Sequence, residues 1–268
     1  MSDQKYVHGY LVHENQRLVD QASTLAELLH ADTAFPPDSN VLEAGCGVGA
    51  QTITVARNNP RARIQSVDIS ASSLKAAKER IEGAGITNVA FHQADIFDLP
   101  FPAASFDHIL VCFVLEHLRD PVAALSGLKA VLKPGGSIIV IEGDHGSTYF
   151  HPDNEYARRA VQCLVDIQAS MGGDALIGRR LYPLLAEAGF KDVRVSPRMV
   201  YVDASKPQLV DGFTIKTFTA MVEGVRGQAI ARNLIDADSW EKGIRGLYRT
   251  TEPDGVFCYT FFKAVAVV

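Results

Sequence analysis

The chain has 268 residues, of which 47% are apolar and 21% charged, and its net charge is −5; this length and composition predict one α/β domain that carries insertions. Its apolar runs are only of strand length, its first ten residues contain no apolar stretch, and its four cysteines form no CxxC pair, so we expect a cytoplasmic protein without a signal peptide or membrane span. Lysine and arginine are not clustered, which disfavours nucleic acid as the main partner because a phosphate-binding groove needs grouped cations.

The first half of the chain alternates between segments with a helical spacing of apolar residues and short apolar segments typical of buried strands. The predicted helices are 11–30, 52–58, 71–84 and 121–131, and the predicted strands are 41–44, 64–69, 89–94, 106–113 and 137–142. Ser70 is expected to cap the helix that follows it, and residues 133–136 predict a turn. Alternation with short connections predicts a parallel sheet with right-handed crossovers and helices on both faces.

The second half departs from this strict alternation. It predicts helices over 153–171 and 181–188, a mainly helical stretch over 205–250, and strands over 193–202 and 256–267. We therefore expect an α/β fold with a Rossmann-like, doubly wound, seven-stranded and mostly parallel sheet, an antiparallel last strand and a helical lid.

The expected organisation is a ligand-binding core with segments that cover it. The segments are an N-terminal lid segment over 1–35, a Rossmann-like core over 36–145, a helical lid with a core helix over 146–190, a core strand over 191–204, a helical lid insertion over 205–250 and a final core strand over 251–268. Insertions at the carboxyl ends of parallel strands tend to cover the ligand crevice, which favours a lid over plain surface decoration.

The stretch from Val41 to Ala50 contains the first predicted strand and the glycine-rich turn that leads into the next helix. Glycines at such a junction allow a sharp turn and a close approach of the backbone to a ligand, and the helix start adds free N–H groups. Asp68 ends the second predicted strand, where a carboxylate can accept hydrogen bonds from both hydroxyls of a ribose. These features fit two cofactors, because Gly45, Gly47 and Ala50 also satisfy the dinucleotide fingerprint G-x-G-x-x-G/A.

Further features favour S-adenosylmethionine over a nicotinamide dinucleotide. Glu43 lies two residues before the first glycine, where an acid would repel a diphosphate but can hold the ammonium of a methionine tail, directly or through water. Asp95 and Ile96 follow the third predicted strand, where the carboxylate can accept from the amine of adenine and the isoleucine can pack nearby. The chain also lacks a second mononucleotide-binding half for a nicotinamide.

Several stretches of the chain together resemble the class I S-adenosylmethionine-dependent methyltransferases, in the type 11 group that includes the ubiquinone and menaquinone C-methyltransferases. The stretches, which follow the family's order and spacing, are Val41–Gly49, Ser66–Ser70, Gln93–Phe101, Ser105–Leu118 and Leu132–Gly136. The resemblance implies methyl transfer from S-adenosylmethionine to an oxygen, nitrogen or carbon nucleophile. It leaves the acceptor open, because this family methylates many scaffolds.

The same resemblance implies roles for individual residues. Those implied for the cofactor site are Gly45, Gly47 and Gln51 at the methionine end, Asp68 and Ile69 beside the ribose and adenine, Asp95 and Ile96 around the adenine, and Phe113 beside the sulfonium.

The catalytic candidates are side chains that could take a proton from the acceptor. His145 lies three residues past the fifth predicted strand, His117 follows the fourth, and Tyr10 lies on the N-terminal segment. A general base helps a hydroxyl or an acidic carbon to react, whereas a neutral amine or a thiolate needs none. Each candidate has a structural alternative: His145 as a cap, His117 as part of a helix start and Tyr10 as packing. No pair of histidines or carboxylates has metal-ligand spacing, so no metal is expected.

Other functions also fit the cofactor motif. They are a methyltransferase acting on protein or tRNA, an NAD-dependent oxidoreductase, and a binding protein without turnover. The acidic charge balance and the expected lid favour a small-molecule methyl acceptor as the partner, because a macromolecule needs an open face. No membrane partner is expected, and the sequence leaves a homodimer open.

Overall fold

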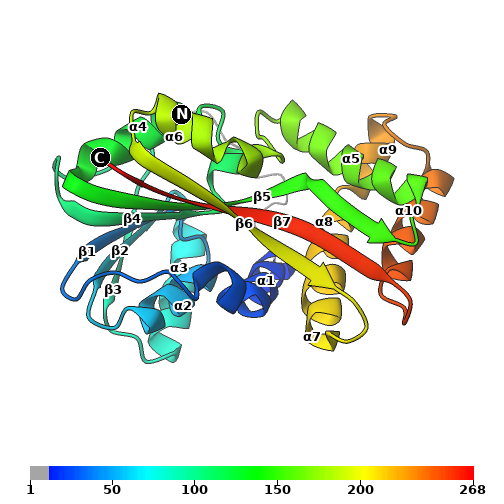
Figure 1. Ribbon diagram of the computed structural model, residues 1–268, viewed down its shortest axis with the longest axis horizontal. Coiled ribbons are helices and arrows are strands. Elements are labelled where there is room, and N and C mark those ends of the chain that lie inside the picture. The colour runs from blue at the N-terminus through cyan, green and yellow to red at the C-terminus, as the bar shows by residue number, and fades with distance from the viewer. Residues whose placement is uncertain (1–11) are drawn as a thin grey trace. The chain divides into compact units, whose positions relative to one another are not determined.

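The computed structural model describes residues 12–268, and its main feature is a seven-stranded sheet with the order β3-β2-β1-β4-β5-β7-β6 (Figure 1). The strands are β1 Asn40–Ala44, β2 Arg63–Asp68, β3 Val89–Gln93, β4 Phe106–Cys112, β5 Leu132–His151, β6 Lys191–Val202 and β7 Val256–Val267. The sheet is mostly parallel, with antiparallel last strands. The predicted Rossmann-like, seven-stranded α/β fold is therefore confirmed.

Strand β1 lies at the point where the strand order reverses. It pairs in parallel with both β2 and β4, and Ala44 is in register with Val67 on one side and Val111 on the other. The carboxyl ends of these three strands therefore meet at one edge. In open α/β sheets the ligand binds outside such an edge, at the reversal of strand order. The fold thus brings the glycine-rich turn after β1 and Asp68 of β2 to the expected ligand crevice.

Helices cover both faces of the parallel strands. They are α2 Ala50–Asn58, α3 Ala71–Gly83, α4 Pro121–Val131 and α6 Leu181–Glu187, with α2 and α3 on one face and α4 and α6 on the other (Figure 1). Local signals explain where two of them begin. The Ser70 hydroxyl accepts from the Ser73 N–H at 3.2 Å, as predicted, and Asp120 accepts from the Ala123 N–H at 2.8 Å, directly before Pro121.

The chain divides into two compact units. One comprises the described residues up to Leu25 together with Gly143–Leu176 and Arg198–Phe261; the other comprises Ala26–Glu142, Ile177–Pro197 and Phe262–Val268. The second unit contains β1 to β4 and therefore all of the predicted cofactor-binding residues.

The first unit is mainly helical. Its elements include α5 Glu155–Ser170, α7 Pro207–Leu209, a π-helix over Val210–Thr219, α8 Ala220–Glu223, α9 Arg226–Ala231 and α10 Ala237–Arg249, while α1 Val12–His30 begins in this unit and ends in the other. Helix α10 packs closely on α5 because Gly243 carries no side chain: a Cβ there would lie 2.6 Å from the carbonyl oxygen of Tyr156. The mainly helical character predicted for 205–250 is confirmed.

Strand β5 is longer than predicted at both ends. Residues 133–136, predicted as a turn, belong to the strand as an irregularity of its pairing with β4, where Gly135 has a φ of 76°. The strand also continues from Glu142 to His151, so the prediction that His145 follows the strand is wrong. Glycine and polar residues are typical of turns, but here the His145 side chain is buried, and tertiary packing outweighs the local preference.

None of the helices within residues 12–268 is both long and apolar enough to cross a membrane. The same part of the chain has no group of three or more histidine, cysteine, aspartate or glutamate side chains that could hold a metal ion. The lid predicted for 1–35, 146–190 and 205–250 stays a prediction.

Candidate cofactor site

The turn after β1 is built from glycines in the left-handed region of backbone conformation. Gly45, Gly47 and Gly49 have φ angles of 82°, 52° and 75°. A Cβ on Gly45 would lie 2.4 Å from Cγ2 of Val114, and one on Gly49 would lie 3.0 Å from Cα of Ala77. Other residue types would therefore be both strained and obstructed at these two positions. The backbone passes tightly from β1 into α2, whose free N–H groups begin at this turn.

Asp68 connects the end of β2 to the glycine-rich turn. Its Oδ2 accepts a hydrogen bond from the Gly47 N–H at 2.8 Å, and its Oδ1 accepts from the Ser70 N–H at 2.9 Å. Burial raises the pKa of the Asp68 carboxyl, and these backbone N–H groups partly offset that effect. Each carboxylate oxygen can accept more than one hydrogen bond, so the half-buried side chain can also accept from a ligand. Its direction is set by the backbone before any ligand binds.

Glu43 is buried between β1, β2 and α2. The Thr52 hydroxyl lies 3.1 and 2.8 Å from its two carboxylate oxygens, and the Ser66 hydroxyl donates to Oε2 at 2.6 Å. Burial is the main cause of a raised pKa at this carboxyl, and the nearby charge of Asp68 raises it further. Two hydroxyl donors leave part of the acceptor capacity of the carboxylate unused. The contact with a ligand ammonium stays a prediction.

Apolar side chains are exposed just past the ends of β2 and β3. Ile69 is 54% exposed and Phe97 is 45% exposed, while Ile96 is half-buried against the core. Asp95 is exposed, and its Oδ1 accepts from the Phe97 N–H at 3.0 Å, which fixes the start of this loop. Together these side chains present a partly apolar surface that carries the Asp95 carboxylate. Phe97 was not predicted as a site residue.

The segment after β4 is held by a buried acid. Phe113 has a φ of 59°, which is uncommon for an aromatic residue, and its N–H donates to the Ile141 carbonyl at 2.9 Å. The N–H groups of Val114 and Leu115 both donate to Oε1 of Glu142, at 3.0 and 2.7 Å. Glu142 is fully buried, and burial raises its pKa well above the ordinary value.

Glu142 was missed in the sequence, although an acid directly after an apolar strand segment is a signal for it. Its Oε2 has no hydrogen-bond partner among the described residues. By fixing Val114, whose side chain lies against Gly45, it connects the end of β4 to the glycine-rich turn.

The side chain of Gln51, the second residue of α2, contacts a residue of α1, outside the glycine-rich turn. Its Oε1 lies 2.9 Å from Nε2 of His30, the last residue of α1. His30 is fully buried, and burial is the main reason that its pKa falls to about 4. No local pattern marks His30, because its significance depends on contact with a helix that begins 20 residues later.

The predicted catalytic residues are found in different parts of the chain. His117 is half-buried in a short 3-10 helix, Leu115–His117, with its Nε2 3.6 Å from Oε1 of Glu116. His145 belongs to the other unit, where its Nδ1 lies 2.7 Å from the Tyr259 hydroxyl. Tyr10 lies outside the described residues. The catalytic roles of all three stay predictions.

Comparisons with known proteins point to one family. Residues 36–189, more than half of the chain, match the family described as "Methyltransferase domain". The ubiquinone/menaquinone biosynthesis C-methyltransferase UbiE of Shewanella frigidimarina is 31% identical over 196 residues, which cover 72% of this chain and 73% of that protein. An uncharacterized 37.1 kDa protein in transposon TN4556 of Streptomyces fradiae is 32% identical over 191 residues.

The match to the Streptomyces protein covers 70% of this chain but only 54% of that protein, so the chain spans about half the length of this relative. Among solved structures, the YcgJ protein of Bacillus subtilis superimposes with a TM-score of 0.57 at 16% identity, over 94% of this chain and 98% of that chain. At this identity the likeness concerns the fold alone.

Proposed function

The chain belongs to the methyltransferase domain family, and from that premise we propose that it transfers a methyl group from S-adenosylmethionine to an oxygen, nitrogen or carbon atom of a small molecule. The observation that carries the proposal is the orientation of Asp68. Its carboxylate is tied by the Gly47 N–H to the glycine-rich turn and lies directly before the exposed Ile69. S-adenosylmethionine fits this arrangement, with its ribose at Asp68, its adenine toward Ile69 and its amino-acid tail toward the glycine-rich turn.

The buried acid at Glu43 supports an amino-acid tail over a diphosphate. A diphosphate at the turn would bring two or more negative charges toward Glu43 and Asp68, and the Asp68 charge already raises the pKa of Glu43. The ammonium of a methionine tail has the opposite charge. A nicotinamide dinucleotide is therefore the less favourable ligand.

S-adenosylmethionine supplies a sulfonium methyl group that is already electrophilic when bound. The remaining task of the protein is to align the acceptor atom behind that methyl, at roughly 3–3.5 Å, and to exclude water. For a hydroxyl or an acidic carbon a general base adds about 10²–10⁴-fold. His117, His145 and Tyr10 remain the candidates for that base.

A small-molecule acceptor is supported by the net charge of −5 and by the lack of clustered cations, which a tRNA substrate would require. The name of the Shewanella relative supports carbon as one of the acceptor atoms to test. We also propose a cytoplasmic location, which the four free cysteines support. A homodimer stays an open prediction.

Calorimetric titration of the full chain with S-adenosylmethionine, S-adenosylhomocysteine and NADH tests the proposal. We expect saturable binding of both adenosyl compounds and no binding of NADH. Binding of NADH without binding of S-adenosylhomocysteine would instead favour the oxidoreductase. Transfer of a tritium-labelled methyl group to small-molecule, protein or tRNA fractions then identifies the acceptor class.

A further inference from the structure

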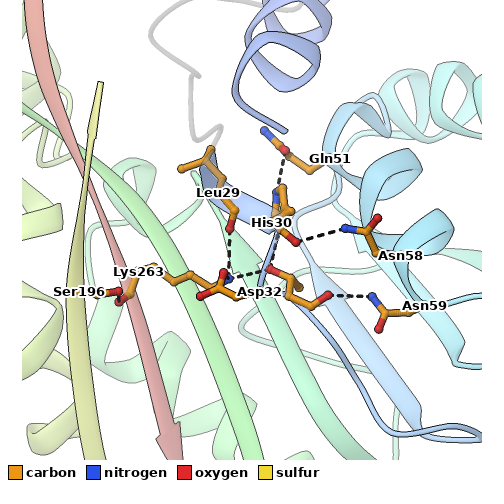
Figure 2. Close-up of polar contacts among 9 residues, drawn as sticks. Leu29, His30, Asp32, Gln51, Asn58, Asn59, Ser196 and Lys263 are labelled. Atoms are coloured by element: carbon orange, nitrogen blue, oxygen red, sulfur yellow. Dashed lines mark hydrogen bonds and ion pairs between the residues drawn. The ribbon is translucent and has the colours of Figure 1, made fainter. Parts of the chain in front are cut away.

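A buried lysine of β7 contacts the end of α1 and the loop that follows it. Nζ of Lys263 lies 3.1 Å from the Leu29 carbonyl oxygen, 2.6 Å from Oδ1 of Asp32 and 2.7 Å from Oγ1 of Thr33, and the side chain is 2% exposed (Figure 2). An ammonium has three N–H donors and no acceptor. Lys263 therefore donates in all three contacts, including the one to the Thr33 hydroxyl.

With this donor, one arrangement of the next two hydrogen bonds gives every proton between Lys263 and Gln51 an acceptor. Because Oγ1 of Thr33 accepts from Lys263, its own proton is available to Nδ1 of His30, 3.2 Å away. A neutral imidazole that accepts at Nδ1 carries its proton on Nε2. That Nε2–H donates to Oε1 of Gln51 at 2.9 Å. The imidazole is neutral near pH 7 because burial lowers the pKa of His30 to about 4.

Two asparagines at the end of α2 also donate hydrogen bonds to the end of α1 and to the loop that follows it. The Asn58 amide donates to the His30 carbonyl at 3.1 Å, and the Asn59 amide donates to the Thr33 carbonyl at 3.1 Å (Figure 2). These two hydrogen bonds hold the loop that carries Thr33 and the helix that carries Gln51 in one arrangement.

We propose that Lys263, Thr33 and His30 are positioning residues that orient the amide of Gln51, with its oxygen toward His30 and its NH₂ group available to the cofactor. The proposal rests on the proposed function and on the place that the family resemblance implies for Gln51, at the methionine end of S-adenosylmethionine. An NH₂ group is a donor, so it suits the carboxylate of the methionine tail and not the ammonium. The ammonium is left to the acid at Glu43. The two ends of the amino-acid group are thereby recognised by groups of opposite hydrogen-bonding character.

The test compares two ligands that differ only in this carboxylate, S-adenosylmethionine and decarboxylated S-adenosylmethionine. Thr33→Val removes the hydroxyl at nearly constant volume, and we expect about tenfold weaker binding of S-adenosylmethionine with the decarboxylated ligand changed less than about twofold. Thr33→Ser, which keeps the hydroxyl, should bind both ligands as the wild type does. Gln51→Glu keeps an acceptor for His30, loses the donor and adds a charge that repels the tail carboxylate, so it should give a larger selective loss.

Equal losses for both ligands in Thr33→Val and Gln51→Glu would mean a merely structural role and would overturn the proposal, as would no loss in either. A wild-type protein that binds neither ligand would refute the proposed function itself. The hydrogen-bond chain has a test that needs no ligand: in imidazole ¹H–¹⁵N spectra at pH 7, His30 should be the Nε2–H tautomer. In Thr33→Val we expect this tautomer preference to weaken. An unchanged tautomer would contradict the proposed hydrogen bonds from Lys263 through Thr33 to His30.

Discussion

Replacing Asp68 by alanine is expected to weaken the binding of S-adenosylhomocysteine by about 100-fold or more. The ligand would lose the hydrogen bonds that we propose between its ribose hydroxyls and the carboxylate, and bonds that involve a charged group contribute about 1.5–3 kcal/mol each. The same change removes the acceptor of two backbone hydrogen bonds, which the Gly47 N–H donates to Asp68 at 2.8 Å and the Ser70 N–H at 2.9 Å. The turn proposed to receive the amino-acid tail would lose this side-chain contact with β2 and keep only the backbone hydrogen bonds to the Val67 carbonyl, so we expect both halves of the ligand to be affected. Titration calorimetry measures the change directly.

Two controls separate loss of the ligand contact from loss of a charge or of the fold. Glu82→Ala removes an equal charge from an exposed ion pair with Lys78, at 3.9 Å on α3, and should leave affinity unchanged because such pairs contribute little. Thermal unfolding without ligand checks that Asp68→Ala is folded. If a folded Asp68→Ala variant bound the ligand within about threefold of the wild type, Asp68 would not be a ribose-binding residue.

The stability of the protein is expected to fall by roughly 3 kcal/mol through His30 alone as the pH is lowered from about 6.5 to about 4. In the unfolded chain a histidine takes up a proton near pH 6.5, whereas in the folded protein burial lowers the pKa of His30 to about 4. Between these values the unfolded state binds more protons, so falling pH favours unfolding. Above about pH 6.5 the neutral imidazole contributes its full stability. Urea unfolding at several pH values from 7.5 to 4.5 measures the slope.

Other charged groups act on His30 and on the same pH range. Lys263 lowers the pKa of His30 and Asp32 raises it, and the half-buried His108 also has a lowered pKa. The effect of His30 is therefore read from the difference in unfolding free energy between the wild type and His30→Gln. His108 is present in both proteins and cancels. We expect that difference to shrink by most of 3 kcal/mol between pH 7 and pH 4.5; a constant difference would show that His30 is not buried as a neutral group.

The fold could be predicted where local signals and tertiary structure agree. Helix α4 begins and ends as predicted, because Asp120 caps it and Pro121 suits its first turn. Strand β7 also has its predicted bounds, Val256–Val267, since an apolar segment directly follows Gly255. The error lies in β5, where turn-forming residues occur inside a continuous strand and only the packing around them decides the outcome.

The candidate site was predictable to the extent that its residues belong to one contiguous motif. The glycines and Asp68 follow the first two strands directly, so strand order alone brings them together. Lys263 could not be connected to this site from the sequence, because its partners lie 230 to 234 residues earlier in the chain. A lone lysine in the apolar run of β7 was the available signal. The catalytic base could not be identified either, since the need for one depends on the acceptor.

The structure of a crystal soaked with S-adenosylhomocysteine is the sharpest test of the proposed cofactor site. We expect the ribose hydroxyls on Asp68, the adenine against Ile69 and Ile96, and the amino-acid tail at the turn from Gly45 to Gly49 with its carboxylate on the Gln51 amide. A turn left empty by the ligand, or one that takes the diphosphate of a dinucleotide in its place, would contradict it.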